Sequence, residues 1–162
     1  MDFIQYLQNW TKADINQGKW MIGIAILIIL PICILFIQTS NSLQKGMLIP
    51  LCLLLLMNIS YGSYLLISKS KHVEQTSKSF QLKPKETTEN EVAKIKADDK
   101  SYTMTKYAWA GLLILSVICF FIFNKDYFRG LSLGFAIMFM GMLVIDVFLH
   151  HSLKLYLLNV IK

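Results

Sequence analysis

Charged residues are scarce in this 162-residue chain, at 16% of the total, whereas soluble proteins carry roughly a quarter. None occurs in four long stretches, at residues 20–44, 46–68, 107–124 and 130–145. Each stretch approaches the ~20 apolar residues that a helix needs to cross a hydrocarbon layer about 30 Å thick. The stretches also lack the polar stripe of a soluble amphipathic helix. With 55% hydrophobic residues, the sequence therefore predicts an integral membrane protein.

Cysteine is also sparse, and its pattern excludes two kinds of site. Cys33, Cys52 and Cys119 each lie in an apolar stretch, form no C-x-x-C pair and are odd in number. They predict packing residues rather than a disulfide framework or a metal site. The sequence also lacks a glycine-rich phosphate loop and a G-x-S-x-G nucleophile motif. No cofactor is therefore expected.

Arginine occurs once, at Arg129, so the net charge of +6 comes almost entirely from lysine. Most lysines lie beside the apolar stretches, which favours attraction to anionic lipid head groups over nucleic-acid binding. Thirteen of them fall in the hydrophilic terminal and central segments, at residues 1–19, 69–106 and 154–162. The two short linkers between apolar stretches hold only Lys45, Lys125 and Arg129. Since basic residues mark the cytoplasmic side, both termini are expected in the cytoplasm, beneath the inner (cytoplasmic) membrane.

The alternation of apolar stretches and linkers predicts an all-α integral membrane protein, with four transmembrane helices arranged as two hairpins. The hairpins are expected at residues 20–68 and 107–153. A charged, partly helical cytoplasmic connector at 69–106 joins them, with a helix from about residue 88 that continues into the third span. A cytoplasmic tail follows at 154–162. Pro31 should kink the first span, because proline removes a helical hydrogen bond.

The first nineteen residues predict an amphipathic helix that lies in the membrane interface. Its apolar side chains recur with helical spacing on one face, at Phe3, Tyr6, Leu7, Trp10 and Ala13. An aromatic face of this kind is typical of a helix lying among lipid head groups. The alternative is a short helix that packs on the protein itself. Residues 1–19 lack the basic start and cleavage site of a signal peptide.

The fourth span carries a face of small residues. Gly130, Gly134 and Gly141 lie within about 40° of one another on a helix of 3.6 residues per turn. Small residues four apart let two helix backbones approach closely. This face therefore predicts helix packing, either within the chain or through self-association with a second copy.

The same span contains the only charge inside an apolar stretch, Asp146. An aspartate within a membrane is costly and requires polar partners. His150 follows one turn later on the same face, and Asn58 and Tyr61 of the second span should lie at a similar depth. These four residues predict a polar site that binds a proton or a ligand. The alternative is a buried network that fixes the register of the helices. Together with His151, His150 also allows the hypothesis of a metal site or a haem site. A haem site would require His72 to lie nearby.

No motif in the sequence identifies a reaction, so we expect a non-enzymatic membrane protein that acts by recognition in or beside the bilayer. Besides the lipid bilayer, a protein partner is expected. The size and the hairpin layout are similar to those of colicin-type immunity proteins, which implies immunity against a membrane-targeting bacterial toxin. One alternative is a transport or channel subunit with Asp146 as its titrating group. Another is a metal-dependent membrane enzyme that uses Asp146, His150 and His151.

Overall fold

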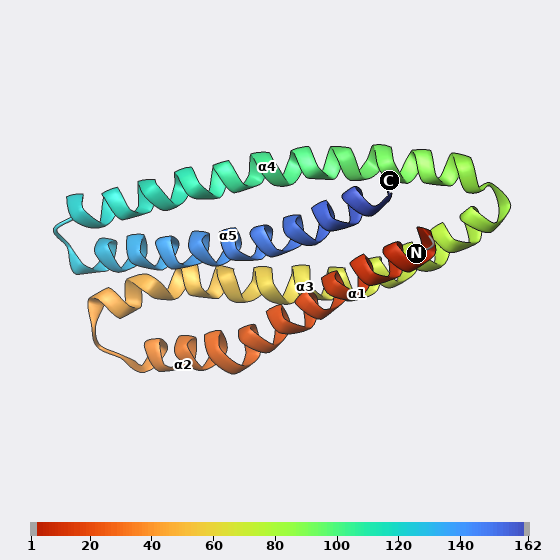
Figure 1. The fold of residues 1–162 in the computed structure, drawn as a ribbon. Helices are drawn as coiled ribbons and strands as arrows, with labels where there is room; N and C mark the ends of the chain where they lie inside the picture. Colours follow the sequence, from red (N-terminus) through yellow and green to blue (C-terminus); the bar gives the residue numbers. More distant parts are fainter. Residues whose placement is uncertain (1–2, 161–162) are drawn as a thin grey trace.

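A computed structural model describes residues 3–160, and nearly all of them are helical (Figure 1). The described residues exclude the first two of the predicted segment 1–19 and the last two of the predicted tail 154–162. The elements are α1 (Phe3–Ile24), a π-helical turn η1 (Ala25–Ile29), α2 (Leu30–Gln38), α3 (Ser42–Leu82), α4 (Pro84–Ile122) and α5 (Asp126–Val160). The prediction of an all-α fold is therefore confirmed.

The elements form four continuous helical rods, and each rod is long enough and apolar enough to cross a membrane. They have 36, 41, 39 and 35 residues, the first being α1, η1 and α2 in continuous succession. At 1.5 Å per residue, rods of this length reach about 50–60 Å. Since a hydrocarbon layer is only about 30 Å thick, each rod extends well beyond its apolar stretch.

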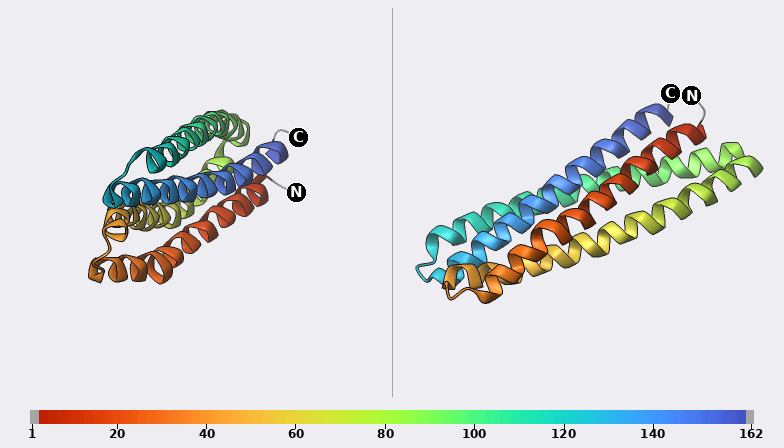
Figure 2. Two further views of the ribbon diagram at one scale, coloured as in Figure 1. Left: turned by 90° about the vertical axis from the view of Figure 1, so that its left-hand side faces the viewer. Right: turned by 90° about the horizontal axis from the view of Figure 1, so that it is seen from below.

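The rods lie side by side in one elongated bundle (Figures 1 and 2). The loops that follow α2 and α4 lie at one end, and the α3–α4 turn and the two chain ends lie at the other. α5 occupies the centre and packs against α1, α3 and α4, while α1 also packs along α3. Helix α4 is the outlying one, since only 6% of its apolar stretch is buried, against 39% in α5. Its packing is mainly with α5 and much less with α3.

The buried positions repeat with the spacing of a helical bundle. Helix α1 buries a row in which steps of four and three alternate, at Leu7, Thr11, Asp14, Gly18 and Met21. Helix α5 buries a comparable row from Gly130 to Tyr156, in steps of four as far as Asp146 and in steps of three and four beyond it. Such a row keeps one face of each helix against its neighbours, as in left-handed bundles. The row includes polar residues, which therefore lie inside the bundle.

The prediction that residues 1–19 form a helix lying in the membrane interface is wrong. Leu7 and Trp10, on its aromatic face, are buried within the bundle. The Trp10 ring stacks on that of Tyr156 with centroids 4.7 Å apart, and Phe3 stacks on Phe80 at 4.8 Å. Because α3 and α5 also extend beyond their apolar stretches, they supply aromatic partners for this face. The protein therefore takes the place that lipid head groups would have around an interfacial helix. The predicted face packs on the protein itself, although Ala13 is exposed.

The connector at 69–106 is fully helical apart from its turn, so its helix begins before residue 88. Helix α3 continues to Leu82, Lys83 is non-helical, and α4 begins at Pro84. Proline disfavours a helical conformation in the residue before it, yet suits the first turn of a new helix. The Lys83–Pro84 pair therefore reverses the chain with a single non-helical residue.

Pro31 lies just after the π-helical turn. There the backbone N–H of Leu30 donates to the carbonyl of Ala25, five residues earlier. Proline has no N–H and its ring clashes with the preceding turn, and a local widening of the helix accommodates both effects. Figure 1 shows the change of direction between α1 and α2 at this point.

Glycine sets the closest helix contacts. A Cβ on Gly130 would collide with the backbone of Leu43, and one on Gly46 with the backbone of Tyr127. A Cβ on Gly134 would lie 2.9 Å from the ring of Pro50, and Gly141 is in ordinary contact range of Leu54. The glycine face of α5 thus lies against α3 of the same chain. Gly18 of α1 and Gly62 of α3 form a second pair, because a Cβ added to either glycine would lie only 2.8 Å from the carbonyl oxygen of the other.

Substitution of Gly130 by alanine should destabilise the protein by about 1–3 kcal/mol, because the added methyl group has to displace backbone. The matched control is Gly111→Ala in α4, where nothing lies within 4 Å of the added carbon. Alanine there should be neutral or stabilising by up to about 1 kcal/mol. Unfolding in mixed detergent micelles measures both variants. Equal effects at the two positions would contradict the close approach of α3 and α5.

Candidate functional site

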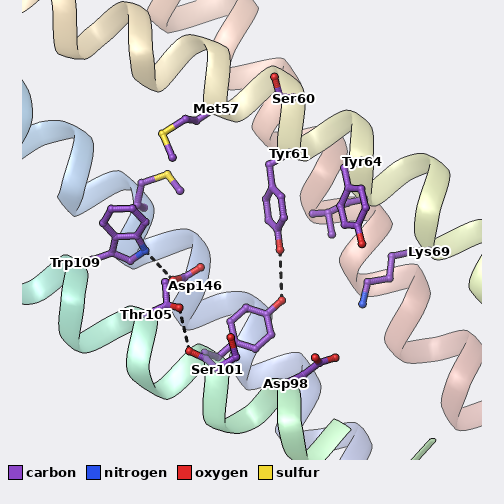
Figure 3. Close-up of a pocket in the computed structure, with 13 residues that line it drawn as sticks. Met57, Ser60, Tyr61, Tyr64, Lys69, Asp98, Ser101, Thr105, Trp109 and Asp146 are labelled. Carbon is purple, nitrogen blue, oxygen red and sulfur yellow. Dashed lines mark hydrogen bonds between the residues drawn. The ribbon is translucent and has the colours of Figure 1, made fainter. Parts of the chain in front are cut away.

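A groove of about 690 Å³ opens between α3 and α4, with α5 as its floor (Figure 3). It exists because α4 packs on α5 and diverges from α3. Its lining combines aromatic, apolar and charged side chains: Met57, Ser60, Tyr61, Tyr64, Leu65, Lys69, Asp98, Ser101, Tyr102, Thr105, Trp109, Met142 and Asp146. The groove straddles the boundary between the apolar stretches and the hydrophilic connector. It therefore joins an apolar half to a charged half.

Two of the four residues predicted as a polar site line this groove, namely Asp146 and Tyr61. Asn58 does not, because its amide donates to the carbonyl of Leu54 in its own helix, at 2.8 Å. His150 is 3% exposed and does not line the groove either. The predicted residues thus share one region of the bundle without forming one cluster.

Asp146 is only 6% exposed. One carboxylate oxygen, Oδ2, accepts a hydrogen bond of 3.0 Å from the indole N–H of Trp109 (Figure 3). The other oxygen has no hydrogen-bond partner among residues 3–160. Trp109 was not among the residues predicted for the site, and its indole holds this carboxylate at the edge of the groove.

His150 lies behind the groove, between two charged side chains of α4. Its Nε2 is 2.6 Å from Asp99, and its Nδ1 accepts a hydrogen bond from the ammonium group of Lys106. The ring also stacks on Tyr102, with centroids 5.9 Å apart. His150 therefore ties α5 to α4 rather than facing a ligand.

Two tyrosines meet across the groove. The hydroxyl groups of Tyr61 on α3 and Tyr102 on α4 are 3.5 Å apart. Burial, followed by the neighbouring Tyr61, raises the pKa of Tyr102 well above its ordinary value. Its phenol therefore remains protonated at physiological pH and can donate a hydrogen bond. Tyr102 was missed from the sequence because it lies in the charged connector, where no site was expected.

A buried ion pair closes the end of the groove near the α3–α4 turn. Lys69 lies 2.7 Å from Asp14, which is 2% exposed, and its ammonium group sits 3.8 Å from the centre of the Trp10 ring. Asp14 was not predicted, although the helical spacing in the sequence places it on the same face as Leu7 and Gly18. All three residues are buried in α1.

The histidines do not assemble a metal or haem site. His72 pairs with Glu91 at 2.7 Å, in the helical part of the connector, and packs edge-on against Trp10. His151 is exposed. Within residues 3–160 no group of three or more His, Cys, Asp and Glu side chains could hold a metal ion. The structure therefore gives no support to the metal-dependent enzyme.

Replacement of His150 by alanine should lower the free energy of unfolding by about 2–4 kcal/mol, because it leaves Lys106 and Asp99 without their shared partner. The neighbouring His151→Ala is the control, and it should change stability by about 0.5 kcal/mol or less because that side chain is exposed. Thermal unfolding in detergent compares the two. A larger effect at His151 would refute the arrangement around His150.

The Asp14 carboxyl should make stability depend on pH. Burial raises its pKa above the ordinary 3.8, and the opposing effect of Lys69 does not cancel this. The folded state therefore holds this proton more tightly than the unfolded chain does. Its contribution to the free energy of unfolding is full below pH 3.8 and declines as the pH rises through the raised pKa. In the Asp14→Asn variant, the part of this decline that comes from Asp14 should be absent when the free energy of unfolding is measured over a series of pH values. Parallel pH curves for the variant and the original protein would contradict the raised pKa.

The chemistry of the groove suits binding. Its phenols and the indole of Trp109 are hydrogen-bond donors and aromatic surfaces, and its carboxylates are acceptors. Wide grooves lined by apolar walls and a few oriented polar groups are typical of ligand sites. No family model, no curated protein and no solved structure matches this chain.

Proposed function

We propose that this chain is a multi-pass protein of the bacterial inner membrane, crossing the bilayer as two helical hairpins with both termini in the cytoplasm. The four long apolar helices support insertion. The excess of lysine at the end of the bundle that holds the termini and the α3–α4 turn supports this orientation. The exposed apolar surface of α4 then faces lipid.

Its function in this proposal is recognition of a ligand in or beside the bilayer, without catalysis. The observation that carries the proposal is the groove between α3 and α4. A buried carboxylate with an unpaired oxygen is unfavourable next to hydrocarbon. A groove that presents one, together with two phenols and an indole, is suited to an occupant that satisfies these groups.

Immunity against a membrane-inserting toxin is one form of this recognition. A spanning helix about 10 Å wide and 30 Å long occupies roughly 2,400 Å³, far more than the 690 Å³ of the groove. A toxin helix would therefore place only some of its side chains in the groove, and its body would remain outside it.

Photo-crosslinking in living cells tests the proposal. Benzoylphenylalanine replaces Tyr64, which lines the groove and is 57% exposed, or Tyr107, which lies outside the groove and is 76% exposed. Irradiation should give a discrete adduct from position 64 only, because only that probe touches an occupant. Position 107 should give diffuse attachment to lipid.

Mass spectrometry of the adduct separates the forms of the proposal. A small-molecule adduct specific to position 64 supports recognition of a ligand, and a toxin polypeptide supports immunity. No adduct at position 64, or the same products at both positions, would show that the groove is not a recognition site.

A further inference from the structure

We infer that the groove binds an organic cation with a bulky apolar body, that is, a lipophilic cation. This inference rests on the proposed function, since it takes the groove to be the recognition site, and it names the class of occupant. Four features carry it: the size of the groove, its polarity along the bundle axis, its charge and its aromatic lining.

The size of the groove selects a small molecule. A volume of about 690 Å³ lies within the ~300–1,000 Å³ of small-molecule sites. Drug-sized compounds fit such a space, whereas a helix of a partner protein does not. The groove is also only partly enclosed, so that a molecule dissolved in the bilayer can enter from the side.

The polarity of the groove changes along the bundle axis. Met57, Met142 and Trp109 form the end that lies nearer the loops, within the apolar stretches, where Asp146 is the one charged residue of the lining. Lys69 and Asp98 form the opposite end, at the water-facing connector. Met57 and Lys69 are twelve positions apart, which corresponds to about 18 Å of helix. An occupant therefore keeps an apolar part toward the bilayer centre and a polar part toward the connector.

The charge of the groove favours a cation. Both lysines near it are engaged, Lys69 with Asp14 at 2.7 Å and Lys106 with His150. In contrast, Asp98 forms no ion pair within residues 3–160, and Asp146 keeps one carboxylate oxygen unpaired.

The charged side chains around the groove also favour a cation as its occupant. The acidic groups that line the groove or support its lining are Asp14, Asp98, Asp99 and Asp146. They outnumber the two lysines, and they still do so if His150 is counted as a cation. This local acidic excess stands out in a chain whose net charge is +6.

The aromatic lining suits the same kind of occupant. Tyr61 and Tyr64 stack with centroids 6.0 Å apart, and Tyr102 and Trp109 face them from α4. Aromatic faces attract cations, most strongly where water is excluded. The bundle already uses this interaction, because the ammonium group of Lys69 lies over the ring of Trp10.

Two ions of nearly the same size and shape provide the test: tetraphenylphosphonium, a cation, and tetraphenylborate, an anion. Calorimetric titration of the full chain in lipid nanodiscs, with empty nanodiscs subtracted, measures saturable binding of each ion. The cation should bind at least about tenfold more tightly than the anion, because the unpaired carboxylates attract one and repel the other. Equal binding, or no saturable binding of the cation, would overturn the inference.

Two charge-removing variants locate the binding. Asp98→Asn and Asp146→Asn should each weaken cation binding by about fivefold or more, and the exposed Asp126→Asn at the distant end of α5 should leave it unchanged. Asp98 lies outside the buried core, so its variant remains informative even if Asp146→Asn fails to fold. Unchanged binding in Asp98→Asn would refute the assigned site.

The crosslinking experiment distinguishes failure of this inference from failure of the proposed function. If position 64 gives a discrete adduct while the cation shows no preference over the anion, the groove is a recognition site for another class of ligand. If position 64 gives no adduct and neither ion binds, both proposals are wrong.

Discussion

The close contact between α3 and α5 organises the rest of this structure. Gly46 on α3 and Gly130 on α5 bring the two backbones together at the loop end, where no side chain could fit between them. Within a bilayer such contacts matter because lipid chains are as apolar as the side chains, so association depends on close packing. With α3 and α5 as the central pair, α1 packs over both. Helix α4 follows α5 and leaves α3, and the groove is the space that results.

The opposite end of the bundle uses charge where the loop end uses small residues. Asp14 pairs with Lys69 across α1 and α3, and His150 joins α5 to Asp99 and Lys106 of α4. Buried ion pairs add little net stability, but removal of one partner is strongly destabilising. A shift in register would separate these partners, so the pairs favour the observed alignment of the helices. Among the acidic residues that line the groove, Asp98 and Asp146 take no part in these pairs.

The candidate site could be predicted only in part. Counting depth along each span brought Asp146 and Tyr61 to the same level, and both line the groove. Depth does not give the rotation of a helix, so Asn58 was included although its amide is satisfied within α3. Tyr102 and Trp109 were missed for the same reason, because the predicted helix through the connector and the third span did not show which of its side chains face α3 and α5.

The sequence by itself determined the helical class and the four long apolar helices. Uncharged apolar runs of this length indicate such helices even when no contact between residues is known. The glycine spacing on α5 also marked a face able to pack closely. Only the tertiary structure decided that this face meets α3 of the same chain, and that the aromatic face of residues 3–13 packs inward. The physical reason is that an apolar or aromatic face can be covered equally well by lipid or by protein. The choice depends on partners that lie far away in the sequence, such as Tyr156 for Trp10.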